Sequence, residues 1–288
     1  MQRLNMVSLA RLAPIGLGVA FGLFFVFTSP LQHAPLWPVW ASLAVALTTT
    51  AGAVFPYGLD RWAELAELSK RPTVRVRDVA TRVTAIAAIT LLVIILGSLR
   101  LLGSQPWRPV ALLTFTILGS VPAVGVMDGV RRTADNESAL GVTGEQVAVL
   151  VRLRQLLQRL LAAVGSVVAL STLATGASLA PQPDLPAESA HTLPPQFVLV
   201  FGGVGSLLVA LFYLPAATAI QRRGQRLCDE LFPLDEAEEV SAILSLAEGR
   251  QKLEQLLGVD HGVIADLQTG LAILGPLLAS AAAAFLSP

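Results

Sequence analysis

The stretch VALLTFTILGSVPAVGVMDGVRR, residues 110–132, decides the fold. Its apolar run is as long as one membrane crossing, since a helix needs roughly 20 such residues to traverse about 30 Å of hydrocarbon. The run ends at Asp128, and Arg131 and Arg132 follow about one turn later. The carboxylate is either a working group inside a membrane or a mark of where the membrane stops, and the rest of the sequence bears on this choice.

Composition places the whole chain in the same class. Of its 288 residues, 54% are hydrophobic and only 14% are charged, whereas soluble domains carry about 25% charged residues. The apolar residues fall into long blocks instead of being spread as a soluble core needs. We predict an all-α, polytopic helical membrane protein with a helical cytoplasmic layer and about seven transmembrane helices, at 12–28, 36–59, 83–102, 110–127, 160–179, 197–220 and 269–286.

These blocks divide the chain into three hairpins, one final helix and the polar segments between them. The transmembrane hairpins are predicted at 1–60, 83–130 and 160–220. The cytoplasmic segments are predicted at 61–82, 131–159 and 221–268. In the first, a helix is predicted at Trp62–Arg71, with Leu65 and Leu68 on one face. The second is predicted to be an interfacial helix that then turns in as the fifth span. The C-terminal segment, 269–288, is predicted to be either a transmembrane or a re-entrant helix.

The placement of basic residues orients the chain. With a cytoplasmic N-terminus, all but two of the 20 Lys and Arg residues lie on the cytoplasmic side, and the exceptions are Arg100 and Arg108. We therefore expect a protein of the plasma (inner) membrane with its N-terminus inside and its C-terminus outside. The net charge is zero, so no basic excess favours binding to nucleic acid.

Charged residues at the inner ends of three spans have two interpretations. Asp128 can pair with Arg131 or Arg132 at helical spacing, as expected of boundary residues that reach the interface. The alternative is an inner vestibule in which such side chains meet permeating ions or a gating partner. We favour the boundary interpretation. The candidate inner-mouth charges are Asp60, Arg61, Asp128, Arg131, Arg132, Arg222 and Arg223.

Small and hydroxyl residues within the spans also have two interpretations, because they can let helices pack closely or can line a water pathway. The candidate pathway-lining residues are Thr48, Thr49, Thr50, Thr116, Ser120, Ser171, Thr175 and Ser178. Proline in a membrane helix frees a backbone carbonyl and often bends the helix. The candidate hinges are therefore Pro56, Pro122 and Pro215, each shortly before a polar exit.

Motifs for catalysis are missing from the sequence. No Asp, Glu, Lys, Arg or His lies near the centre of a predicted span, which argues against proton-coupled transport. No HExxH, GxSxG or GxxxxGK[ST] is present, and the single cysteine, Cys228, has no evident activating partner. We therefore expect neither enzyme activity nor a bound cofactor or metal.

Three functions stay open at this point. A passive channel, or a pore-forming membrane subunit made of one chain or a homo-oligomer, fits the hydroxyl faces and the lack of buried charge. A membrane scaffold or signalling component would dock a cytoplasmic protein partner through the amphipathic segment 235–257. An intramembrane enzyme or ion-coupled transporter fits least. The sequence narrowly favours the channel, with the lipid bilayer as the one partner common to all three.

Overall fold

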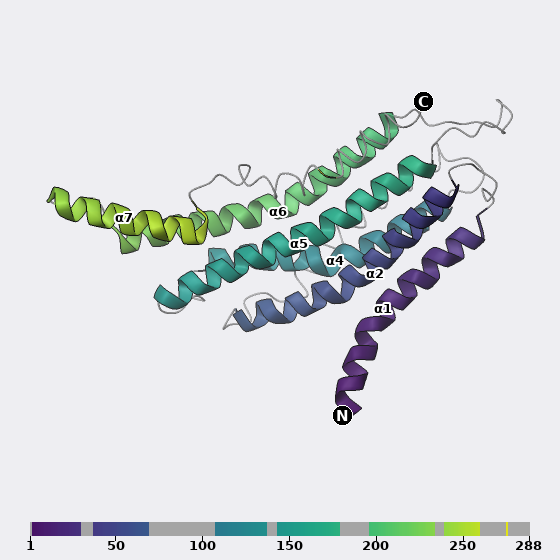
Figure 1. Cartoon of the computed structure of the whole chain (residues 1–288), viewed down its shortest axis with the longest axis horizontal. Coiled ribbons are helices and arrows are strands. Elements are labelled where there is room, and N and C mark those ends of the chain that lie inside the picture. Colours follow the sequence, from purple (N-terminus) through teal and green to yellow (C-terminus); the bar gives the residue numbers. More distant parts are fainter. Residues whose placement is uncertain are drawn as a thin grey trace.

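The computed structural model describes residues 2–29, 37–68, 107–136, 143–178, 196–233 and 239–259, together with Gly275. Every regular element in these ranges is a helix, so the predicted all-α class is confirmed for the described chain. The helices are α1 (Gln2–Phe27), α2 (Trp37–Leu68), α4 (Trp107–Asp135), α5 (Thr143–Ser178), α6 (Gln196–Leu231) and α7 (Val240–Leu257). Figure 1 shows the first five side by side as a bundle, with α7 along the last part of α6.

Four of these helices are long and apolar enough to cross a membrane. They cover Trp37–Leu68, Ala111–Asp135, Gly144–Ala177 and Phe201–Leu231, with mean hydropathies from 1.5 to 1.8. The first predicted span corresponds to a shorter apolar helix, Leu12–Phe27. The helices are compatible with an integral membrane protein, with four full-length spans in the described chain instead of seven. Apart from Gly275, the predicted spans 83–102 and 269–286 lie outside the described residues.

Close helix crossings hold the first half of the bundle together. Thr48 of α2 packs directly on the two α1 glycines Gly18 and Gly22, which have no side chain to keep the helices apart. Further along α2, a Cβ atom added at Gly58 would lie 2.6 Å from the backbone nitrogen of Ala123 in α4. Small residues at these points therefore set the close approach of α1, α2 and α4.

The charged parts of the helices gather at one end of the bundle. In Figure 1 the last turns of α2 and α6 and the first turns of α5 lie at the same end, where α7 also packs. Glu64, Arg152 and Arg226 belong to these turns. The described helices therefore place a charged layer next to an apolar layer.

Apart from α7, the charged layer consists of the ends of the long apolar helices. α2 extends to Leu68, so the inner helix predicted from Trp62 is its last turns, and Leu65 and Leu68 both pack on the core. The interfacial helix predicted to turn at the start of the fifth span is corrected in the same way. α5 runs unbroken from Thr143 to Ser178 because no proline interrupts it and its buried leucine stripe never changes face.

One apolar cluster fills the middle of the bundle near the charged layer. Leu150, Leu153, Leu157 and Leu160 of α5 are each at most 2% exposed. The cluster also contains buried residues from the neighbouring helices, among them Leu65, Val126, Val130, Ile220 and Leu227. Protein interiors packed in this way contain few voids larger than a water molecule. Hydrocarbon side chains therefore close the centre of the described bundle.

α7 ends in a defined stop signal. Gly258 has a left-handed backbone with φ of 61°, and its N–H donates to the carbonyl of Gln255 at 3.1 Å. The N–H of Val259 donates to the carbonyl of Glu254 at 2.9 Å, which completes the glycine-terminated Schellman pattern. The start of α7 is at Val240, and the predicted start at residue 235 lies outside the described residues.

A side chain from α5 holds this end of α7. Nη1 of Arg154 donates a hydrogen bond to the backbone carbonyl of Leu257 at 3.0 Å, where a cation also complements the helix dipole. Arg250 of α7 adds an ion pair to Asp229 of α6 at 2.8 Å. α7 is thus fastened to both α5 and α6.

Candidate functional site

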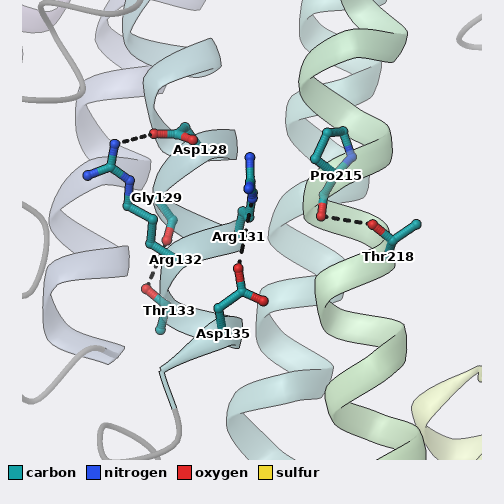
Figure 2. A network of polar contacts seen from close by, with 8 residues as sticks. All are labelled: Asp128, Gly129, Arg131, Arg132, Thr133, Asp135, Pro215 and Thr218. Carbon is teal, nitrogen blue, oxygen red and sulfur yellow. Dashed lines mark hydrogen bonds and ion pairs between the residues drawn. The ribbon is translucent and has the colours of Figure 1, made fainter.

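Asp128 forms an ion pair on its own helix. Its Oδ2 lies 2.9 Å from Nη2 of Arg132, which confirms one of the two predicted partners (Figure 2). The two atoms are buried and their angle is not that of a hydrogen bond, so the interaction is a charge contact at hydrogen-bond distance. Arg131 pairs instead with Asp135, at 3.8 Å, one turn further on. The pair neutralises Asp128 locally and leaves no evident role for a mobile ion.

Arg61, a candidate inner-mouth charge of α2, also forms its contacts within its own helix. Arg61 pairs with Glu64 one turn later, and its guanidinium lies 4.8 Å from the centre of the Tyr57 ring. Asp60, beside it, is exposed. These contacts stay within the last turns of α2 and do not reach the charges of α4.

Arg223 and Arg222 of α6 lie in different surroundings. Arg223 is buried, and its Nη2 donates to Oε1 of Gln146 in α5 at 3.3 Å, whereas Arg222 is exposed. α6 packs mainly against α4 and α5, and α2 also packs against both of them, so these two helices stand between the charges of α2 and those of α6. The structure therefore does not gather the seven predicted charges into one ring.

The predicted pathway-lining hydroxyls mostly bond back to their own helices. Thr48 is fully buried, and its hydroxyl donates to the Ala44 carbonyl at 3.0 Å. The same pattern, donation to a carbonyl three or four residues earlier, holds for Thr116, Ser120, Ser171 and Thr175. Thr49 and Thr50 are half-buried, and Ser178 ends α5. Within the described residues these contacts are those of packing side chains.

The three candidate hinge prolines lie inside continuous helices. Pro56 is in α2, Pro122 in α4 and Pro215 in α6. Pro122 lies where α4 meets Gly58 of α2, so two of the three prolines belong to one close crossing. Figure 2 shows the third on α6, where the Thr218 hydroxyl donates to the Pro215 carbonyl at 3.1 Å. The three prolines lie within helices, as predicted from the sequence, whereas bending of the helices at these positions stays a prediction.

Metal and thiol chemistry has little support in the described chain. No group of three or more His, Cys, Asp or Glu side chains that could hold a metal ion occurs among the described residues. Cys228 is fully buried in α6, and the three histidines lie outside the ranges that the structure describes.

The face of α5 opposite its leucines was not predicted as a functional feature. Its exposed residues recur at heptad spacing, and between Arg152 and Ser166 they are only polar or small. We call them the α5 polar stripe: Arg152, Gln155, Arg159, Ala162 and Ser166. The sequence contains a signal for this face, since Arg152 and Arg159 lie seven residues apart, but both belong to the segment 131–159 that was predicted to lie at the interface.

Two contacts fix the register between α5 and α6, which run antiparallel (Figure 1). Near the charged end, Arg223 hydrogen-bonds Gln146. Toward the other end, Gly205 packs directly against Val168. The α5 polar stripe lies between these two contacts, so each of its residues can be matched to the α6 residue at the same height along the bundle.

The α5 polar stripe is level with an apolar row on α6. At 1.5 Å of rise per residue in both helices, Arg159 is level with the turn between Leu211 and Leu214, and Ser166 is level with Leu207. Leu207 is 68% exposed and Leu211 is 56% exposed. The outward face of α6 therefore suits hydrocarbon, whereas the outward face of α5 at the same level carries the guanidinium of Arg159 and the hydroxyl of Ser166, which donates to the Ala163 carbonyl at 2.8 Å.

The segment predicted to dock a partner, 235–257, is only partly covered. Leu253 and Leu257 of α7 pack on the core, whereas Leu244 and Leu256 are 66% and 61% exposed. The predicted apolar stripe is thus split between two faces of α7. Polar side chains such as Glu248 and Lys252, which pair at 2.8 Å, occupy the surface between the exposed leucines.

Comparison with known proteins adds nothing to this geometry, because no protein-family model, no curated protein and no solved structure matches the chain. What the chain does must therefore be argued from its own helices.

Proposed function

We propose that the protein is the subunit of a passive channel whose passage runs between chains, along the α5 polar stripe. The observation that carries the proposal is the stripe's level: Arg159 is exposed where the neighbouring helix presents Leu211 and Leu214 to its surroundings. One helix face at this level suits water and the other suits lipid. A homo-oligomer that turns its α5 faces inward satisfies both.

The energetic cost of the alternative supports this arrangement. An arginine facing hydrocarbon costs up to about 2.5–3.5 kcal/mol on insertion scales, the upper value applying at the centre of a bilayer, and Gln155 facing hydrocarbon would add an unsatisfied amide. Arg159 can lean toward the charged end, because helical side chains tilt toward the N-terminus of their helix. Ala162 and Ser166, deeper along the same face, give it no apolar cover.

A passage inside one chain has less support. The centre of the described bundle is filled by Leu150, Leu153 and their neighbours, and opening it would remove packed side chains from one another. The hydroxyls that would line such a passage, such as Thr48 and Thr116, already donate to their own backbone. We therefore propose a passage between the chains of a homo-oligomer.

The finer topology belongs to the same proposal. Segments 83–102 and 269–286 would complete seven spans, with the last one spanning or re-entering. The arginine distribution supports a plasma (inner) membrane location with a cytoplasmic N-terminus and the charged layer inside. The domain divisions stay as predicted, except that the inner segments near residues 62 and 143 continue the helices of the bundle.

Ion flux through purified protein in liposomes tests the function. We expect the full chain to conduct, and Ser166→Trp to reduce the flux strongly because the indole fills a passage at that level. Leu207→Trp is the matched control, since it adds an indole at the same level on the lipid-facing side of α6. A silent wild-type protein across a panel of monovalent ions, or equal effects of both variants, would contradict the proposal.

A scaffold is the second candidate, and the exposed leucines of α7 favour it. Leu244 and Leu256 lie on a helix of the charged layer, outside the apolar layer. Site-specific photo-crosslinking from position 244 in cells should give one discrete adduct with another protein. The same probe at exposed Gln251 should not. Absence of an adduct at both positions would remove the scaffold from consideration.

A further inference from the structure

We infer that the passage selects small inorganic anions, and that Arg152 and Arg159 are the residues that determine this selectivity. The inference rests on the proposed channel and names the class of ion that it would carry. It follows from the sign, the pairing and the level of the charges on the α5 polar stripe.

The stripe has charge of one sign only. From Arg152 to Ser166 its exposed residues include two arginines and no carboxylate. The nearest acid on this face is Glu145, fourteen residues or about 21 Å before Arg159. That separation is about twice the Debye length of roughly 8–10 Å at physiological ionic strength, so Glu145 does little to offset the deeper charge.

The two guanidinium groups differ from other arginines of the molecule in having no ion pair. Arg132, Arg61 and Arg250 each lie within 4 Å of a carboxylate. No ion pair joins Arg152 or Arg159 to a carboxylate among the described residues. Their charge is therefore directed at the surroundings of α5 instead of being neutralised by the fold.

The level of Arg159 strengthens its effect on an ion. It lies about 10 Å deeper than Arg152 and level with the exposed leucines of α6, so its surroundings include low-dielectric material. In an oligomer each chain would add one guanidinium at each of these two levels. Rings of arginine or lysine are a general means by which pores favour anions and exclude cations.

The experiment measures the reversal potential of the full chain in planar bilayers under a KCl gradient. We expect a chloride-selective potential, and Arg152→Gln/Arg159→Gln should lower the chloride-to-potassium permeability ratio by about tenfold. Arg226→Gln/Lys252→Gln is the matched control, because it removes two exposed positive charges from α6 and α7. Arg159→Lys keeps the charge and should keep most of the selectivity.

The outcomes separate the inference from the channel itself. Conductance with a potassium-selective or unselective wild-type protein would overturn the inference and leave the channel standing. An equal loss in both double variants would also overturn it, because a general surface charge would then be responsible. Absence of any conductance would contradict both proposals. Should the double variant fail to insert, the single change Arg152→Gln, nearer the start of α5, must still lower the ratio.

Discussion

The outward faces of α5 and α6 lie side by side and are opposite in character. Over the same rise, α6 exposes Leu207 and Leu211, whereas α5 exposes Arg159, Ala162 and Ser166. Both helices have equally apolar inward faces, and both are long enough to cross a membrane. Mean hydropathy therefore assigns the two helices to the same class, while the residues facing outward assign them different surroundings.

The difference shows that the surroundings of a membrane-spanning helix depend on the residues that each of its faces exposes, and not on its mean hydropathy alone. The most apolar 18 residues of α5 have the same mean hydropathy, 1.8, as those of α6. The hydrophobic residues of α5 are concentrated in the stripe that packs on α2, α4 and α6, which leaves polar and small residues on its outward face. Four predictions test this contrast, starting with the largest expected effect.

The two faces of α5 should respond very differently to substitution. Leu153 is fully buried, so Leu153→Ala should lower the free energy of unfolding by about 2–5 kcal/mol through lost contacts and a residual cavity. Arg152, its exposed neighbour, should tolerate Arg152→Gln within about 0.5 kcal/mol. Unfolding in mixed micelles measures both, and similar losses would mean that the outward face is also packed.

The outward faces should differ in their tolerance of charge. Leu207→Arg places a guanidinium against lipid and should cost about 2.5–3.5 kcal/mol of insertion free energy. Ser166→Arg, at the same level of α5, should cost much less because water is already present there. The yield of protein folded into lipid vesicles measures the difference. Equal yields would end the distinction between the two faces.

A third face of α5 contacts α7, where a smaller effect is expected. Gly258→Ala forces a side chain into a left-handed position, which costs about 1–2 kcal/mol, and its methyl group would overlap the guanidinium of Arg154. Hydrogen exchange should then rise within 240–257 and stay unchanged in α2. Unchanged exchange in α7 would show that the Arg154 contact does not hold that helix.

The smallest expected effect is the loss of α7 stability at acidic pH. Lys252 donates a hydrogen bond to Glu248 and lies close to it as a charge, and this lowers the pKa of the Glu248 carboxyl. A lowered pKa means that the pair stabilises α7 fully above the ordinary carboxyl pKa of about 4.3, and that this stability is lost as the pH falls through the lowered value. Helicity of α7 should show this acid dependence, and Glu248→Gln should abolish it.

Much of the architecture could be predicted from the sequence, because it depends on local patterns. Block hydropathy predicted about seven spans, and the all-α class and four helices long and apolar enough to cross a membrane are confirmed among the described residues. Helical spacing predicted that Asp128 pairs with an arginine. Leu65 and Leu68 were also placed correctly on one face. Each of these follows from residues within a few turns of one another.

The features that were missed depend on what a helix meets in space. The turn expected near residue 160 is absent because Leu150 through Leu161 find partners on α4 and α6 and need no lipid. Hydroxyls such as Thr116 donate to carbonyls of the same helix, and their lining of a water pathway stays a prediction. The α5 polar stripe gains meaning only from its level against α6, which no pattern within residues 143–178 reveals.

The most direct test compares water access at matched positions on the two helices. Ala162→Cys on α5 and Leu211→Cys on α6 would be introduced separately into the full chain, whose own Cys228 is fully buried. Reaction with a charged, water-soluble thiol reagent is then timed in lipid vesicles. We predict rapid labelling at position 162 and almost none at position 211. Equal protection of both, or faster labelling at 211, would contradict the claim that water borders α5 where lipid borders α6.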